Sequence, residues 1–160
     1  MRRTLERIYR QHRQGLYSLA LSITRRPELA EEAVQEAFVR LWRSKAEPSG
    51  EPVAYVHAAV RNTAIDVASE PSETIRIPVS IFESQVLDPQ LHAIDAERRQ
   101  LVRQAVETLP DAERQTLVLK IYAGLTFQQI AQVFGEPLST VSSRYRRVLE
   151  RLKVTMEQCV

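Results

Sequence analysis

Residues 109–153, LPDAERQTLVLKIYAGLTFQQIAQVFGEPLSTVSSRYRRVLERLK, are the stretch of this sequence that decides its fold. Their apolar spacing predicts a helix, a break at Gly124, a short second helix, a turn at residues 135–137 and a long final helix. This order is the outline of a helix-turn-helix, in which the helix after the turn lies in the major groove of DNA.

The residues at the predicted helix ends support this interpretation. Thr126, followed three residues later by Gln129, is a capping-box start for the short helix. Gly124 and Gly135 stand where helix C-caps favour a residue with left-handed backbone angles. Pro137 suits the first position of the final helix, because proline lacks the N–H that would have no partner there.

The final helix is predicted to have two faces. One is an apolar stripe formed by Leu138, Val141, Tyr145, Val148, Leu149 and Leu152. The opposite face holds Thr140, Ser143, Arg144 and Arg147, with Ser142 and Arg146 on one flank. Hydroxyl groups near the start and arginines further along suit contacts with base edges and phosphates. An amphipathic surface helix that happens to be basic is the alternative interpretation.

Length and charge bound the rest of the chain. A chain of 160 residues suits one domain or two small ones. The formal net charge of +2 is modest, but it is unevenly distributed. Residues 1–26 carry seven arginines against one glutamate, a net charge of +6, whereas residues 68–97 carry one arginine against six acidic residues, a net charge of −5.

Composition also indicates where the protein works. Cys159 is the single cysteine, so a disulfide within one chain is impossible, which fits a reducing compartment. No apolar run approaches the roughly 20 residues that span a bilayer, and the N-terminus has no apolar signal-peptide core. We therefore expect a soluble, cytoplasmic protein with no membrane insertion.

Three helices are predicted before the linker, over residues 4–24, 27–43 and 52–67. The second has a charged face formed by Glu32, Gln35, Glu36, Val39 and Arg43. Its central valine is either a scattered exposed residue or the apolar centre of a protein-binding face with a charged rim. The third helix carries Arg61 and Asn62 on a side of small residues, where they are either solvated or touch nucleic acid.

The helical pattern stops between residues 68 and 92, where Pro71, Pro78 and Pro89 and an acidic composition mark a linker. An apolar run at residues 75–82 is interrupted by Pro78, which disfavours a central strand and leaves an extended segment against a partner. Helices return at about residue 93 and again from Pro110. The predicted fold is all-α, with two small helical domains at residues 1–67 and 93–160 joined by the acidic linker 68–92.

Catalytic and metal-binding patterns are missing from the sequence. His12, His57 and His92 share no metal-ligand spacing with each other or with Cys159. The sequence contains no phosphate-binding glycine loop and no nucleophile elbow. We therefore expect no enzyme activity, no metal and no cofactor.

Two parts of the sequence resemble one protein family. Residues 29–43, LAEEAVQEAFVRLWR, and 53–66, VAYVHAAVRNTAID, resemble region 2 of the extracytoplasmic-function (ECF) sigma factors, and residues 109–153 resemble region 4. The resemblance implies a two-domain promoter-specificity subunit of bacterial RNA polymerase. Its implied partners are core RNA polymerase, promoter DNA and an anti-sigma protein, and its linker would run toward the RNA exit channel.

The resemblance also implies roles for individual residues. The residues implied to bind the polymerase clamp helices are Glu32, Gln35, Glu36, Val39, Arg40 and Arg43. Contact with the −10 element falls to Arg61 and Asn62, the latter where the family reads a base flipped out of the stack. Contact with the −35 element falls to Ser142, Ser143, Arg146 and Arg147, with Thr140 and Arg144 close by.

Two departures from the family pattern matter. Many members carry a run of arginines after the RNTAID stretch, whereas residues 67–73 here are neutral to acidic. This difference predicts either a weaker grip on upstream DNA phosphates or a different balance in promoter melting. Glu136 occupies a turn position that is usually apolar, and Ser142 a position that is often basic. We expect Leu138 to fill the core beside this turn.

Two other functions remain open from the sequence. One is a free-standing helix-turn-helix regulator whose N-terminal helices dimerise or sense a signal. The other is a sigma-like decoy that binds a regulator or polymerase without melting DNA, an idea that the missing arginine run keeps open. The order of the matching segments favours the sigma factor over both.

Overall fold

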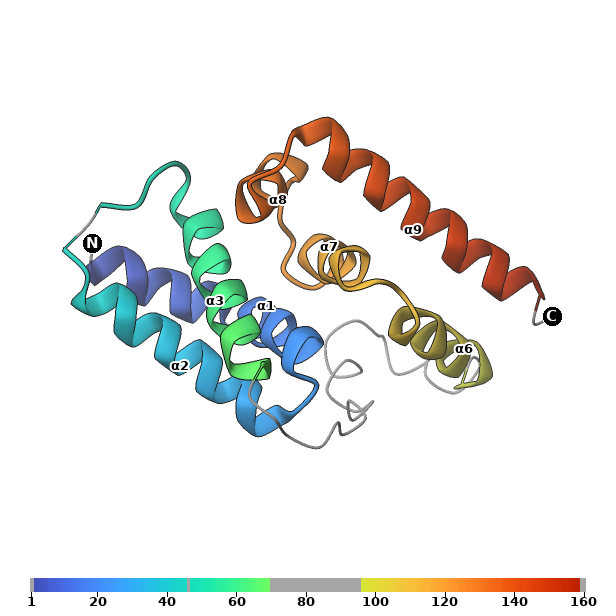
Figure 1. The fold of residues 1–160 in the computed structure, drawn as a ribbon, viewed down its shortest axis with the longest axis horizontal. Coiled ribbons are helices and arrows are strands. Elements are labelled where there is room, and N and C mark those ends of the chain that lie inside the picture. Colours follow the sequence, from blue (N-terminus) through green and yellow to red (C-terminus); the bar gives the residue numbers. More distant parts are fainter. Residues whose placement is uncertain (1, 46, 70–95, 159–160) are drawn as a thin grey trace.

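The computed structural model describes residues 2–45, 47–69 and 96–158. The described chain is all-α, as predicted, and forms α1 (Arg2–Thr24), α2 (Pro27–Arg43), α3 (Pro52–Ala68), α6 (Ala96–Glu107), α7 (Asp111–Ile121), α8 (Phe127–Phe134) and α9 (Leu138–Gln158) (Figure 1). Within these ranges, no helix is long and apolar enough to cross a membrane. Most of the predicted linker and Cys159 lie outside the described residues.

Helices α1, α2 and α3 pack on one another as a bundle at the N-terminal end of the chain. Arg25, with a φ of 59°, ends α1 in a left-handed conformation, and Pro27 opens α2. Glu51 caps α3 by accepting hydrogen bonds from the backbone N–H groups of Val53 and Ala54. Apolar residues of all three helices form the bundle core, which includes Leu5, Ile8, Leu16, Val34, Ala37, Leu41, Val56 and Val60.

The helix ends of the C-terminal part largely follow the prediction. Thr126 and Gln129 form the capping box at the start of α8, and Gly124 and Gly135 have φ values of 68° and 65°. Pro137 is not the first residue of α9, as the sequence suggested, since that helix begins at Leu138. The carbonyl of Pro137 accepts the first helical hydrogen bonds, so proline is the N-cap.

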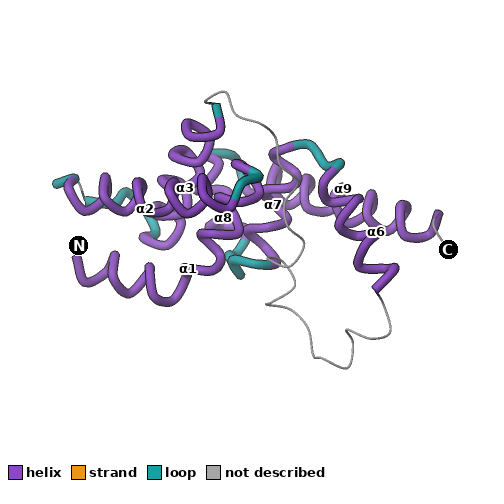
Figure 2. Tube along the Cα trace, turned by 90° about the horizontal axis from the view of Figure 1, so that it is seen from below, coloured by secondary structure: helices purple, strands orange, loops and turns teal. Residues whose placement is uncertain are grey.

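The N-terminal bundle and the C-terminal helices share a core. Leu19 of α1 and Ala54 of α3 are buried in one apolar cluster with Leu119, Leu125 and Ile130 of the C-terminal part. Helix α8 packs on α3, and α7 packs on α1 (Figures 1 and 2). The side of α3 that carries Ala54 packs against α8.

Two large apolar side chains at helix ends are largely exposed, and one of them, Leu138, was expected in the core. Ile121 at the end of α7 is 49% exposed, and Leu138 at the start of α9 is 43% exposed. Ile121 lies beside Leu149, itself 45% exposed, in the lining of an apolar cleft of about 300 Å³ between α6, α7 and α9. The core position predicted for Leu138 is wrong because α9 packs through a different edge of its apolar stripe, as described below.

Candidate functional site

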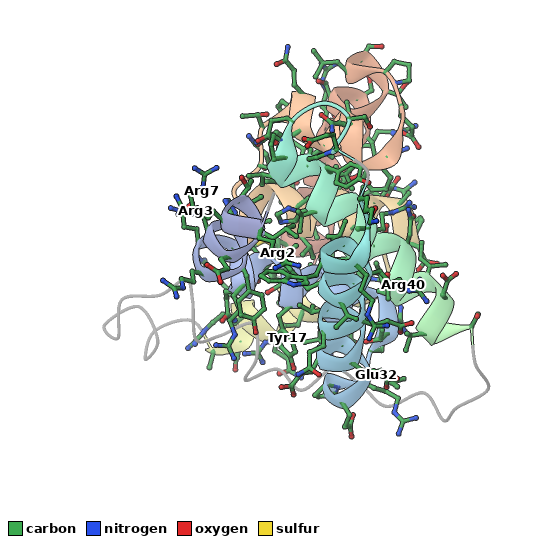
Figure 3. All side chains as sticks on the ribbon, turned by 90° about the vertical axis from the view of Figure 1, so that its left-hand side faces the viewer. Arg2, Arg3, Arg7, Tyr17, Glu32 and Arg40 are labelled. Atoms are coloured by element: carbon green, nitrogen blue, oxygen red, sulfur yellow. The ribbon has the colours of Figure 1, made fainter. Side chains whose placement is uncertain are left out.

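The charged face of α2 is exposed, with Val39 near its centre at 46% exposure. Arg40 forms an ion pair with Glu36 one turn away and lies 4.0 Å from a carboxylate oxygen of Asp66 on α3. Figure 3 shows Glu32 and Arg40 on this helix. The predicted arrangement of an apolar residue within a rim of charged and polar side chains is therefore present on the surface. Glu36 is half-buried, and the exposed side chains are those of Glu32, Gln35, Val39, Arg40 and Arg43.

The guanidinium of Arg2 lies 5.4 Å from the centroid of the Trp42 ring, at the edge of the same face. Trp42 is 41% exposed. A cation over an indole ring is attracted by the negative face of its π system. This contact joins the first turn of α1 to the last turn of α2 beside the Val39 face.

Neighbouring residues Arg61 and Asn62 on α3 have different surroundings. Asn62 is exposed, whereas Arg61 is half-buried against the C-terminal helices. The Nε–H of Arg61 donates a 2.7 Å hydrogen bond to Oε1 of Gln115, and its guanidinium lies 4.6 Å from the centroid of the Phe134 ring. Burial lowers the pKa of Arg61, opposed by the nearby carboxylate of Glu136. Of the pair expected at the −10 element, only Asn62 faces solvent here.

Helix α9 exposes Thr140, Ser143, Arg146 and Arg147 and half-buries Ser142, in keeping with the expected polar face. Arg144 is the exception, because it is only 8% exposed. It follows Val141 by three residues and precedes Val148 by four, so it lies on the same face of the helix as these two core valines. The face that packs is therefore displaced to one side of the predicted stripe. This displacement buries Arg144 and leaves Leu138 and Leu149 exposed.

Arg144 is well partnered in its buried position. Its Nη2 forms an ion pair with Glu136 in the turn, and its guanidinium lies 5.0 Å from the centroid of the Phe134 ring. Its Nη1 lies 3.5 Å from the hydroxyl of Thr116 on α7. Arg61 and Arg144, one from each predicted DNA-binding helix, thus converge on a single aromatic ring. We call Arg61, Gln115, Phe134, Glu136 and Arg144 the Phe134 cluster.

A second set of polar contacts joins α8 to the segment before α3. The backbone N–H of Glu51 donates a 3.1 Å hydrogen bond to Oε1 of Gln132, and Nε2 of Gln132 donates to the carbonyls of Ser49 and Glu51. Nε2 of Gln129 donates to the Glu51 carboxylate at 3.1 Å. Burial acts to raise the pKa of Glu51, but the N–H groups of Ala54 and Val53 and the Gln129 amide outweigh it and lower that pKa.

One buried histidine lies inside the N-terminal bundle. His57 is 0% exposed, its Nδ1–H donates a 2.7 Å hydrogen bond to the carbonyl of Val53, and its ring contacts that of His12. Burial lowers the pKa of His57 to about 4, so the ring is neutral at pH 7. No group of three or more metal-ligand side chains occurs in the part of the chain that the structure describes.

Sequence reasoning missed Phe134 and Gln115, and no sequence pattern marks either residue as functional. It also missed Gln132, which reads as an ordinary polar residue in a short helix. All three lie in helices that were predicted, but their roles depend on the packing of C-terminal helices against the N-terminal bundle.

Comparison with known proteins supports the family that the segments resemble. The model of sigma-70 region 2 matches residues 8–69, and that of sigma-70 region 4 matches residues 105–154. The ECF RNA polymerase sigma factor SigK of Mycolicibacterium vanbaalenii is 31% identical over 155 residues, covering 91% of this chain and 78% of the relative. SigK of Mycobacterium tuberculosis is 27% identical over 147 residues, covering 86% of this chain and 78% of the relative.

A solved structure has the same fold. The sigma factor RpoE of Bartonella quintana, crystallised in complex with the anti-sigma factor NepR, superposes with a TM-score of 0.67 at 19% sequence identity. The match covers 95% of this chain and 96% of that one. Together with the two region models and the SigK relatives, it leads to one conclusion: this chain belongs to the ECF sigma factors of the sigma-70 family, which direct promoter-specific initiation of transcription.

Proposed function

We propose that this sigma factor binds core RNA polymerase through the exposed face of α2 and reads promoter DNA through α3 and α9. The observation that carries the proposal is the Val39 face, where a 46% exposed apolar side chain lies within a rim of charged residues. Protein interfaces have this composition, with an apolar centre and a polar rim. The Glu36–Arg40 ion pair holds two rim side chains in place before a partner arrives.

For the −10 element, we propose that the exposed amide of Asn62 recognises a base taken out of the stack. An asparagine side chain offers both a donor and an acceptor to a base edge. Arg61 would add a phosphate contact after it leaves its partners on α7 and α8. Extracting the base costs a few kcal/mol, which polymerase and backbone contacts would have to offset.

For the −35 element, we propose that Thr140, Ser142 and Ser143 near the start of α9 meet base edges, and that Arg146 and Arg147 anchor phosphates. Ser142 and Ser143 lie in the first turns of the helix, the part that enters the groove in helix-turn-helix proteins. Arg144 is withdrawn from this set because its guanidinium is engaged by Glu136 and the Phe134 ring. Its role in the proposal is to hold α9 at a fixed angle to the turn.

The remaining parts of the proposal concern domains and partners. We assign residues 1–67 to polymerase and −10 contacts, residues 93–160 to −35 contacts, and residues 68–92 to a linker. We propose that the protein acts in the cytoplasm with polymerase, performs no catalysis of its own, and is controlled by an anti-sigma protein, as the Bartonella quintana sigma factor was crystallised with one.

Reconstituted transcription tests this proposal. Purified core polymerase is supplied with a promoter library, and a run-off product should appear only when this chain is added. Failure to bind core polymerase would refute the proposal and favour a free-standing helix-turn-helix regulator. Binding without any run-off product would instead favour a decoy.

A matched pair of variants tests the Val39 face. Val39→Asp should abolish polymerase binding, because it introduces a charge at the apolar centre of the interface. Val154→Asp on α9 is the control, since Val154 is 50% exposed and lies outside the proposed surfaces. Equal loss of polymerase binding in both variants would show that the effect is not specific to α2.

A further inference from the structure

The Phe134 cluster joins the two parts of the chain at the point where both proposed DNA-binding helices meet. Arg61 comes from α3, Gln115 from α7, Phe134 from α8, and Arg144 from α9. Helix α8 lies between α3 and α9 (Figure 1). The ring of Phe134 thus has one guanidinium from the N-terminal bundle at 4.6 Å and one from the C-terminal helices at 5.0 Å.

Glu136 gives this cluster its charge balance. Its carboxylate pairs with Arg144, and it lies near enough to Arg61 to favour the charged guanidinium. The side chain of Arg144 is 10% exposed and that of Glu136 is 32% exposed, so their ion pair is shielded from water on one side. A carboxylate binds a guanidinium through the same charge-assisted contacts as a phosphate. Glu136 and DNA phosphates therefore offer Arg61 the same kind of partner.

We propose that the Phe134 cluster is an intramolecular latch that holds Arg61 on the C-terminal helices and that DNA phosphates compete with it. The DNA part of this proposal rests on the function proposed above for Arg61. While the latch is closed, Arg61 satisfies its charge and one N–H group within the chain. Opening releases the guanidinium of Arg61. A DNA phosphate then takes the place of the Gln115 side chain, the Phe134 ring and the nearby Glu136 carboxylate as its partner.

The polar contacts of α8 with the start of α3 define what else must move. Gln129 and Gln132 bind Glu51 and Ser49 near the start of α3, while Phe134 in the last turn of α8 contacts Arg61 further along α3. Helix α8 is therefore attached to the N-terminal bundle near both of its ends. Separation of α8 from α3 must break the bonds of Gln129 and Gln132 as well as the contacts of Arg61, so both sets of contacts hold the closed form.

This arrangement has a consequence for affinity. When binding requires an open form, the apparent affinity falls by the fraction of molecules that are open. The latch therefore weakens the binding of free sigma factor to DNA and disfavours contact with the −10 element in the absence of a partner that separates the two parts. A partner that binds the open form would shift the population toward it.

The first test measures opening in the full chain, without polymerase or DNA. Cys159 is changed to serine, and dyes are placed at Glu28→Cys on α2 and Lys153→Cys on α9 for single-molecule energy transfer. Phe134→Leu keeps an apolar side chain but removes the π face, so the ratio of open to closed molecules should rise about tenfold. Phe38→Leu is the control, because it makes the same change on α2, where the ring packs on Tyr9 within the N-terminal bundle. Equal distributions in these two variants would overturn the latch.

The second test separates charge from opening. Glu136→Gln should raise the open fraction by about two- to fivefold, since it removes the carboxylate near Arg61. Glu150→Gln makes the same change in net charge on the exposed side of α9 and should leave the distribution unchanged. Equal effects of the two substitutions would overturn the role given to Glu136.

The third test concerns competition with DNA and uses a random-sequence single-stranded oligonucleotide of about 20 nucleotides. Phe134→Leu should tighten binding, and adding Arg61→Gln to it should remove most of that gain. Opening without any gain in DNA binding would overturn the competition with phosphate. Because opening is measured without polymerase, a failure to bind core polymerase would refute the proposed function and leave the result on the latch intact.

Discussion

The two parts of the chain approach each other closely at Gly15 of α1. A Cβ atom added at Gly15 would lie 2.7 Å from the Cα of Ala123 and 2.9 Å from its Cβ. Carbon atoms in contact prefer separations of about 3.5–4.0 Å. Gly15→Ala would therefore force α1 and the segment after α7 apart by about 1 Å. The clash involves backbone and a Cβ atom, so no side-chain rotation can relieve it.

This substitution has two opposite effects. Alanine should stabilise α1 by about 1 kcal/mol relative to glycine, because glycine is a poor helix former. The overpacked contact should destabilise docking of the C-terminal helices by about 1–3 kcal/mol. The N-terminal bundle should thus keep or gain stability while the ratio of open to closed molecules rises by about five- to 150-fold.

The dye pair on α2 and α9 measures the opening, and hydrogen exchange at the amide of Leu125 provides a second measure. That amide donates a 3.0 Å hydrogen bond to the carbonyl of Leu119 in the docked C-terminal part. Gln14→Ala is the control, since it changes an exposed residue of the same helix. If Gly15→Ala keeps the closed energy-transfer distribution and the slow exchange of Leu125, the docking does not depend on this contact and the reasoning is refuted.

Three further predictions follow from buried and inter-part contacts. The pKa of His57 in the folded chain is about 4, below its ordinary value of 6.5. Between these pH values the folded chain binds fewer protons than the unfolded chain. The free energy of unfolding should therefore fall by about 3 kcal/mol as pH drops from 6.5 to 4. Denaturant unfolding between pH 4 and 7.5 checks this, and His57→Gln should remove much of the slope. Arg114 donates hydrogen bonds to the carbonyls of residues 106, 107 and 109 at the end of α6. Arg114→Leu should lower the free energy of unfolding by about 2–4 kcal/mol, because these carbonyls lose their partner. Denaturant unfolding measures this loss. Gln132→Ala should weaken docking by about 1–2 kcal/mol, because its bonds to Ser49 and Glu51 are lost. Energy transfer should then detect a larger open fraction. An unchanged open fraction would show that these bonds do not hold α8 in place.

The helix ends were predictable because their causes are local. The Thr126–Gln129 capping box and the left-handed Gly135 depend on a few adjacent residues, and the structure confirms both. The helix predicted over residues 27–43 was also confirmed as α2, whose Val34 and Leu41 are buried in the bundle. The exposed Val39 face followed from the same periodicity, although its binding partner remains a proposal.

The errors arose where packing between elements decides the outcome. Periodicity defines an apolar stripe but not which edge of it meets the neighbouring helix, so Arg144 was assigned to the wrong face of α9. The ion pair with Glu136 makes its burial tolerable, and that pair is invisible in the spacing of apolar residues. Similarly, Arg61 on α3 was expected to be solvated or to touch nucleic acid, because it lies on a side of small residues. Its contacts with Gln115 and Phe134 depend on packing between distant segments.

The apolar cluster around Leu19 and Ala54 also makes the docking sensitive to temperature. Removal of apolar surface from water lowers the heat capacity, and the resulting stabilisation weakens on cooling. The hydrogen bonds of Gln132 and the cation–π contact of Arg61 do not depend on this effect in the same way. Cooling should therefore loosen the shared core first and leave α8 attached mainly through its polar contacts. Heat absorbed on opening would rise steeply with temperature, which gives the closed form a calorimetric signature of its own.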